Sequence, residues 1–193
     1  MYKRREDELV TSDVTSRNIL YYGQRHRVYP FLEGAVAKSL QRGIAFRYQV
    51  GPGVAYRIYA NRRSYLRLGA ATLYEQSRFE GHEFENYAGT SAVITKWREQ
   101  LFLAGTQVVP DGRLRLNYEL NYQPAFQGHN LLLAAVGGLE LPVGRYVALR
   151  TNFQYSYETV VLTGKQQGDL LVTFGFTITN IFKPEKEASE DED

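Results

Sequence analysis

The sequence predicts an all-β protein, a single antiparallel up-and-down transmembrane β-barrel of about eight to ten strands with no substantial helix. Three observations support this prediction. Long segments alternate between apolar and polar residues, which is the period of a β-strand with two different faces. The 193 residues include 15 Tyr, 10 Phe and 17 Gly, a composition that favours strands and tight turns. Turn-forming residues separate the segments at the spacing of hairpins.

Residues 44–59 alternate most clearly in the first half of the chain. Ile44 and every second residue as far as Ile58 form an apolar face, and the residues between them, such as Arg47, form the opposite face. An ordinary strand has only about five or six residues. The Gly-Pro-Gly sequence at 51–53 therefore predicts a bulge or bend, as in a curved barrel wall.

The other predicted strands are shorter or less regular. The last one places Phe174 on a large apolar face and Thr173 on a small, mildly polar face, and residues 65–75 place Glu75 on a polar face. The predicted segments are 17–26, 29–38, 65–75, 91–105, 113–126, 131–141, 145–158 and 169–182.

This pattern divides the chain into three parts. Residues 1–16 are a polar amino-terminal segment or a truncated strand, residues 17–182 form the barrel, and residues 183–193 are an acidic disordered tail. A single domain accounts for a chain of this length, because no linker interrupts the predicted strands.

Composition excludes several classes of protein. A net charge of only +2, with both signs interspersed, argues against a nucleic-acid partner. The chain has no cysteine, which excludes disulfides, thiolate metal sites and thiol nucleophiles. No apolar run approaches the roughly 18 residues that a membrane-spanning helix needs. Met1 and Tyr2 are followed by a run of charged residues and not by the apolar core of a secretory signal.

We expect the apolar face of the predicted barrel to point outward, toward the lipid of an outer membrane. A tilted strand spans a bilayer with about nine to eleven residues, and several of the predicted segments reach or exceed this length. Aromatic residues such as Tyr56, Tyr122 and Phe174 bracket the apolar runs, as interfacial girdles do. Long and short connections also alternate along the chain. The alternative is a soluble lipocalin-like barrel that binds an apolar ligand inside.

In the membrane orientation, the polar face fills the interior of the barrel. Charged groups in a confined space must be paired, so we expect a network of ion pairs and amides there, including Lys96 and Arg113. Such a network would plug a narrow barrel, although the same face could bind an anionic solute or line a narrow anion or solute channel. The candidate binding residues are Arg47, Arg57, Arg67, Arg98, Arg115, Glu119, Arg150 and Glu158.

No catalytic motif is apparent, and we expect no enzymatic activity, cofactor or metal. The histidines are His26, His82 and His129, and none belongs to a nucleophile elbow or a zinc motif. An outer-membrane lipid hydrolase that uses His82 is the enzymatic alternative. The expected partners are membrane lipid and the barrel assembly machinery, with envelope proteins or surface polysaccharide as further candidates.

Four segments also resemble a known family. They read GPGVAYRIY at 51–59, LRLGAATLYEQ at 66–76, NYELNYQP at 117–124 and TGKQQGDLLVTFGFTITN at 163–180. Together they resemble the bacterial outer-membrane family known as domain of unknown function 481, which includes proteins described as salt-induced outer-membrane proteins. The resemblance implies an outer-membrane β-barrel of a Gram-negative bacterium and brings no catalytic residues. Members normally begin with a signal peptide and further strands, so a truncated amino terminus and a larger strand count stay open.

Overall fold

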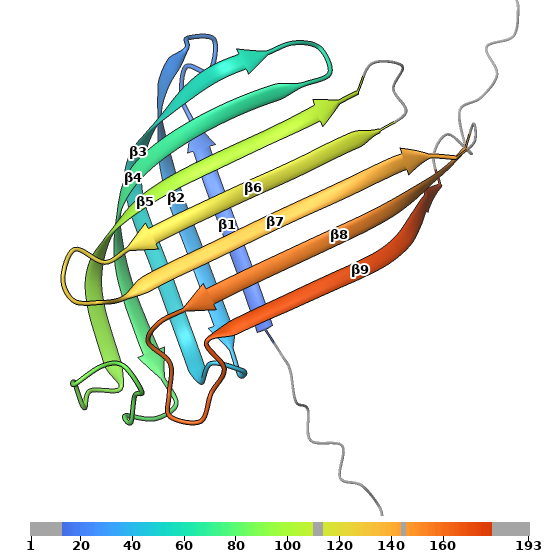
Figure 1. The fold of residues 1–193 in the computed structure, drawn as a ribbon. Coiled ribbons are helices and arrows are strands. Elements are labelled where there is room, and N and C mark those ends of the chain that lie inside the picture. Colours follow the sequence, from blue (N-terminus) through green and yellow to red (C-terminus); the bar gives the residue numbers. More distant parts are fainter. Residues whose placement is uncertain (1–12, 110–113, 144–145, 179–193) are drawn as a thin grey trace, which may run out of the picture.

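A computed structural model describes residues 13–109, 114–143 and 146–178 of the chain. Nine antiparallel strands follow one another in sequence order within one sheet, and the sheet curls into a half-barrel (Figure 1). In the part of the chain that is described, no helix is long and apolar enough to cross a membrane. The strands are β1 (Asp13–Tyr21), β2 (Val28–Ser39), β3 (Ile44–Ala60), β4 (Tyr65–Phe79), β5 (Val93–Val108), β6 (Arg115–Pro124), β7 (Leu131–Pro142), β8 (Val147–Glu158) and β9 (Gly168–Ile178).

The all-β, up-and-down prediction is confirmed, but several boundaries differ. The first strand begins at Asp13 and ends at Tyr21, whereas the sequence predicted 17–26. Strand β4 continues to Phe79, past the predicted end at residue 75. The predictions for Arg113, for the end of the last strand at 179–182 and for the tail at 183–193 concern residues outside the described ranges.

The expected closed barrel is not found among the described residues, because β1 and β9 do not pair. Each strand pairs only with its neighbours in the sequence, so β1 and β9 form the two borders of the sheet (Figure 1). Side-chain contacts across the interior still join the opposite sides of the curled sheet, as described below. The sheet is therefore curled and joined across its interior, and β1 and β9 each have an edge that no other described strand pairs with.

Apolar side chains cover the outer face of the sheet, whereas the concave interior holds buried polar side chains together with two apolar clusters. On the outer face, Leu101 is 53% exposed and Phe174 is 81% exposed. On the inner face, Glu75 and Arg98 are completely buried. This arrangement is the reverse of a water-soluble barrel, in which apolar residues fill the interior.

One residue of the predicted apolar stripe is on the opposite side of the sheet. Ile44 is only 2% exposed and packs in an interior cluster with Phe79 and Ile94. The pairing register between β3 and β4 shifts between Ile44 and Phe46, which breaks the two-residue alternation at that point. The stripe therefore begins at Phe46, and the assignment of Ile44 to the outer face is wrong.

At the predicted bulge or bend, residues 51–53, the pairing of β3 with β4 is interrupted without a change of register. Val50 pairs with Tyr74 and Gly53 pairs with Ala71, whereas the two residues between them are unpaired on the β4 side. The glycines let the curved wall come close to neighbouring groups. A Cβ atom at Gly53 would lie 2.2 Å from Cζ of Phe31, a separation that no side chain tolerates.

A cluster of apolar side chains fills the interior near the β1–β2 and β3–β4 connections. Its aromatic members Phe31 and Phe102 meet edge to face, with ring centroids 5.6 Å apart. The cluster comprises Tyr29, Phe31, Ala55, Ala71, Leu73, Phe102 and Ala104. It divides the interior into an apolar part and a polar part.

The two longest connections, 80–92 and 159–167, lie at the same end of the sheet, as the sequence predicted, although the other connections differ little in length between the two ends. This end of the sheet has connections 40–43, 80–92, 125–130 and 159–167. Two of these pack together, because Phe84 forms a β-bridge with Leu162. The opposite end has connections 22–27, 61–64, 109–114 and 143–146.

Candidate functional site

The polar part of the interior is organised around Glu75, an inward residue of β4. Arg98 on the neighbouring strand β5 donates from Nε to Glu75 Oε2 at 2.6 Å and from Nη2 to Glu75 Oε1 at 3.1 Å. Arg47 Nε and Lys96 Nζ each lie 3.8 Å from Glu75 Oε1. Three cations thus surround one carboxylate, because the register of β3, β4 and β5 brings these inward positions together.

The network crosses the interior to the opposite wall of the curled sheet. Arg47 donates from Nη1 to Glu158 Oε2 at 3.0 Å, and Glu158 is the last residue of β8. Gln49 Nε2 donates to Gln123 Oε1 on β6 at 3.0 Å. These contacts join strands that are far apart in the sheet order. The interior is therefore filled by bonded polar groups, as a buried charged cluster requires.

A second ion-pair cluster lies on β1, β2 and β6. Arg17 binds Glu33 with two hydrogen bonds, from Nε to Oε1 at 2.7 Å and from Nη2 to Oε2 at 2.9 Å. The Arg17 guanidinium also contacts the carboxylate of Glu119 on the opposite wall. Gln100 lies within hydrogen-bonding distance of Glu33 and Asn121 and continues this cluster toward β5. Both walls are again joined through charged groups.

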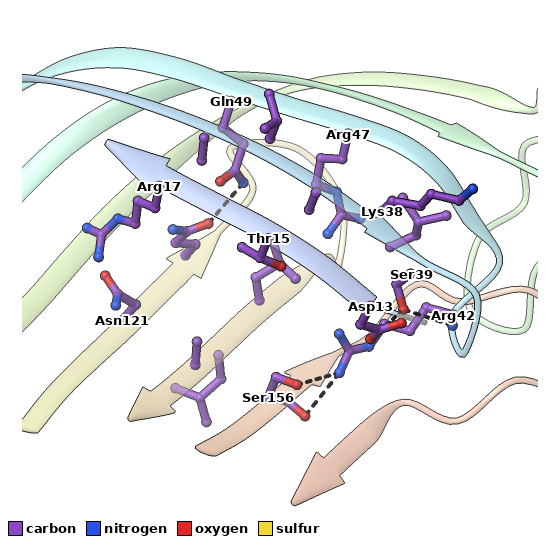
Figure 2. Close-up of a pocket in the computed structure, with 18 of the residues that line it drawn as sticks. Asp13, Thr15, Arg17, Lys38, Ser39, Arg42, Arg47, Gln49, Asn121 and Ser156 are labelled. Carbon is purple, nitrogen blue, oxygen red and sulfur yellow. Dashed lines mark hydrogen bonds between the residues drawn. The ribbon is translucent and has the colours of Figure 1, made fainter. Parts of the chain in front are cut away.

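A small cavity of about 200 Å³ remains between β1–β3 and β6–β8 (Figure 2). At its border, Arg42 donates from Nη2 to Ser156 Oγ at 2.7 Å, and Ser39 Oγ donates to Asp13 Oδ2 at 2.9 Å. Figure 2 shows these four residues together at one end of the cavity, while Arg17 lies at the other end. A second space, of about 470 Å³, borders Arg17, Glu119 and Arg150 on the same inner face.

The structure places the predicted site residues in three different environments. Arg47, Arg98 and Glu158 belong to the Glu75 network, and Glu119 belongs to the Arg17 cluster. Arg67 and Arg57 are half-buried near the other end of the sheet. The remaining two, Arg115 and Arg150, are exposed.

The two half-buried arginines do not join the ion pairs. The guanidinium of Arg67 lies 4.6 Å from the ring centroid of Tyr21, as in a cation–π contact. Arg57 donates instead to the backbone oxygens of Gln24 and Arg25 at the rim. The alternation therefore identified inward arginines correctly, but it did not show which of them pair with carboxylates.

Several members of the network were missing from the predicted site. Alternation had assigned Glu75 to a polar face, but its central role depends on the register of three strands. Arg17 and Glu33 lie in the two least regular segments of the sequence. The sequence signal that could have identified them is a single charged residue, Arg17 or Glu33, near apolar residues in each segment.

The histidines are spread over three connections. His26 lies in 22–27, His82 in 80–92 and His129 in 125–130, and all three are exposed. Within the described residues, no histidine side chain makes a hydrogen bond to a hydroxyl or a carboxylate, and no three potential metal ligands come together.

The family of this chain follows from its sequence. Residues 14–179 match the family model described as protein of unknown function, DUF481. The chain belongs to this family. The match extends over all nine strands apart from the first residue of β1. No curated protein and no solved structure was found to match. The description of the DUF481 family contains no activity, so a function has to be inferred from the structure of this chain.

Proposed function

We propose that this DUF481 protein is an outer-membrane β-barrel with a structural role in the cell envelope and no catalytic activity. The observation that carries the proposal is the reversed distribution of side chains. Glu33, Glu75 and Glu158 are completely buried, while the apolar residues on the other side of the same strands are exposed. A bilayer is the solvent that suits this distribution, because lipid accepts the apolar face and leaves the polar face inside.

The extent of the outer apolar face supports this proposal. Soluble monomers rarely expose a contiguous apolar patch larger than a few hundred Å². Here the exposed apolar residues lie on every strand from β1 to β9, including Leu32, Val54, Leu68, Leu101, Leu120, Leu139, Leu149 and Phe176. Contact with lipid would account for this apolar face, because its exposure to water would be unfavourable.

Strand length gives independent support. Strands β3, β4 and β5 have 17, 15 and 16 residues. A tilted strand needs about nine to eleven residues to span a bilayer. These strands would therefore cross the membrane and continue beyond it, with the two longest connections on the same side.

The polar interior argues against a lipocalin-like carrier. A carrier of an apolar ligand needs an apolar cavity, whereas Arg17, Arg47 and Arg98 and their carboxylate partners fill the centre of this sheet. The same ion pairs obstruct a continuous channel. We therefore propose lipid and the barrel assembly machinery as the partners of the chain.

Membrane association is the direct test. The full chain, expressed in a Gram-negative host, should float with outer-membrane vesicles in a density gradient and should resist extraction by alkaline carbonate. Once extracted, it should stay monodisperse only in detergent. A chain that stays folded and monodisperse in plain buffer would contradict the proposal. Lipase or deacylase activity that disappears in the His82→Ala variant would favour the hydrolase alternative.

A substitution on the outer face provides a second test. Leu101→Arg should lower the free energy of unfolding in lipid vesicles by about 2–4 kcal/mol if Leu101 lies near the bilayer midplane, because the guanidinium would then face hydrocarbon. Thr173→Arg is the matched control, since Thr173 points to the inner face and is exposed there. Equal and small effects of the two substitutions would mean that water covers the outer face.

A further inference from the structure

The wall of the curled sheet is interrupted at the beginning of β5. Residues 93–98 pair with β4, but the ladder between β5 and β6 begins only at Leu101 and is preceded by one isolated bridge, from Arg98 to Ala125. Figure 1 shows this part of β5 projecting past the β6–β7 connection, toward connection 80–92. Among the described residues, positions 93–96 therefore have a strand neighbour on one side only.

A pocket of about 610 Å³ occupies this interruption. We call it the β5 notch, and it lies between residues 94–97 of β5 and residues 126–130. Its border includes side chains from both faces of the sheet, because Trp97 belongs to the outer face and Lys96 belongs to the inner face beside Glu75. The notch thus borders both the outer apolar face and the polar interior.

Lys96 is a buried cation that has no carboxylate of its own. Its side chain is only 10% exposed, and its Nζ lies 3.8 Å from Glu75 Oε1, too far for a hydrogen bond. Arg98 already donates to both oxygens of Glu75. Arg47 likewise donates two N–H groups to Glu158. These four groups are the charges that act most strongly on Lys96, so three cations face two carboxylates and one positive charge is left unbalanced.

Asn130 gives the border of the notch an unused hydrogen-bond donor. Its Oδ1 accepts from Arg98 Nη2 at 2.5 Å, which holds the side chain beside the notch. Its Nδ2 is buried and has no hydrogen-bond partner among the described residues. Such donors are rare in native structures and call for a partner, such as an ion. An anion in the notch would suit both Asn130 and Lys96.

The outer border of the notch ends a row of aromatic side chains. Phe46, Tyr48, Tyr74 and Trp97 follow one another across β3, β4 and β5, with successive ring centroids 6.3, 6.2 and 5.3 Å apart. Phe126 lies next to this row, because its backbone N–H donates to the Trp97 backbone oxygen at 3.0 Å. Aromatic belts of membrane proteins lie at the level of the lipid headgroups. In the membrane location proposed above, the notch is therefore at headgroup level.

We propose that the β5 notch binds the anionic headgroup of a membrane lipid, with the headgroup against Lys96 and the acyl chain along Trp97 and Phe126. This inference rests on the proposed membrane function. A lipid matches the notch because the notch joins an unbalanced positive charge to an exposed apolar surface. A small free anion would leave the apolar border unused, and an uncharged apolar solute would leave the charge of Lys96 unpaired.

The fluorescence of Trp97 provides a direct test, because Trp97 is the only tryptophan of the chain and borders the notch. The full chain in nonionic detergent micelles is titrated with two lipids that carry the same brominated acyl chain. One has a phosphate headgroup, and the other has a zwitterionic phosphocholine headgroup. Bromine quenches tryptophan on contact, so the phosphate lipid should quench Trp97 at an about tenfold lower concentration. Equal quenching by the two lipids would overturn the inference.

Substitutions of Lys96 test the charge that selects the headgroup. Lys96→Gln should remove the preference for the phosphate lipid, whereas Lys96→Arg should keep it. Arg78→Gln is the matched control, because Arg78 is an exposed cation near the same end of β4 and does not line the notch. This control should keep the preference. Loss of the preference in both glutamine variants would indicate a general attraction of anions and would overturn the inference.

A variant of Asn130 keeps the test informative if Lys96→Gln does not fold. Asn130→Asp retains the oxygen that accepts from Arg98 and replaces the unpartnered Nδ2 with a carboxylate oxygen. The variant should therefore fold as the native chain does, and its added negative charge should weaken binding of the phosphate lipid about tenfold. Unchanged binding in a folded Asn130→Asp chain would contradict a headgroup site at this position.

Inorganic phosphate separates a lipid site from a site for a free anion. In large excess, it should reduce quenching by the phosphate lipid no more than sodium chloride of equal ionic strength does. Specific displacement by inorganic phosphate would assign the notch to a free anion and overturn the inference. All these measurements are made in micelles, so they are independent of the flotation test. A chain that floats but shows no headgroup preference would overturn this inference and leave the membrane function standing.

Discussion

Strands β2–β5 and strands β8–β9 follow the same alternation, yet their inward side chains are in different environments. In the first region, inward Glu33, Glu75 and Arg98 are completely buried. In the second region, inward Arg150 and Thr173 are exposed, and Glu158 at the end of β8 is the buried exception that reaches the first region. Alternation therefore decides the face on which a residue lies. The burial of an inward side chain depends on whether another part of the curled sheet lies opposite to it.

The difference has a physical cause in the curvature of the sheet. Long, curved strands β3–β5 (Figure 1) bring inward residues against Arg17 of β1, Gln123 of β6 and Glu158 of β8. Strand β9 has no neighbour beyond its free edge in the described residues. The same kind of residue thus contributes to stability in one region and is solvated in the other.

The largest expected effect comes from removing a buried cation. Arg98→Ala should lower the free energy of unfolding by about 3–5 kcal/mol, because Glu75 would keep its buried charge without its closest partner. Chemical unfolding in detergent micelles, followed by tryptophan fluorescence, measures this. Arg150→Ala in the exposed region is the control and should change stability little. Equal losses in the two variants would mean that the two regions do not differ in burial.

A smaller effect is expected from added volume. Gly69→Ala should cost about 1–3 kcal/mol, because its Cβ would lie 2.1 Å from Cε1 of Phe102 and the ring would have to move. Gly175→Ala on β9 has open space and should be neutral or slightly stabilising. Thermal unfolding of the two variants compares packing in the two regions directly. A destabilised Gly175→Ala variant would contradict the open environment of β9.

The smallest expected effect concerns Arg67 and its aromatic neighbours. Arg67→Met keeps the side-chain volume but removes the charge over the Tyr21 ring, so we expect a loss of about 0.5–1 kcal/mol. Tyr21→Leu should cause a similar loss, and the double variant should lose less than the sum of the two. Strict additivity would show that the two side chains do not interact energetically.

The sequence indicated on which face of the sheet a residue lies, but it did not indicate which charged side chains pair with each other. Period-two alternation placed Arg47 and Arg98 inside and Leu101 outside, and the structure agrees. It failed at Ile44, where a register shift reverses the phase. It also missed the Arg17–Glu33 pair, because β1 and β2 alternate poorly and their pairing depends on tertiary contacts.

By itself, the sequence determined an all-β chain of long antiparallel strands with an apolar and a polar face, because side-chain direction follows residue parity in any strand. Only the tertiary structure decided that Glu75 gathers three cations and that Glu158 reaches across to Arg47. Only the tertiary structure decided that β1 and β9 border the sheet and do not pair with each other. Register, curvature and closure depend on contacts between distant segments, and local alternation carries no information about them.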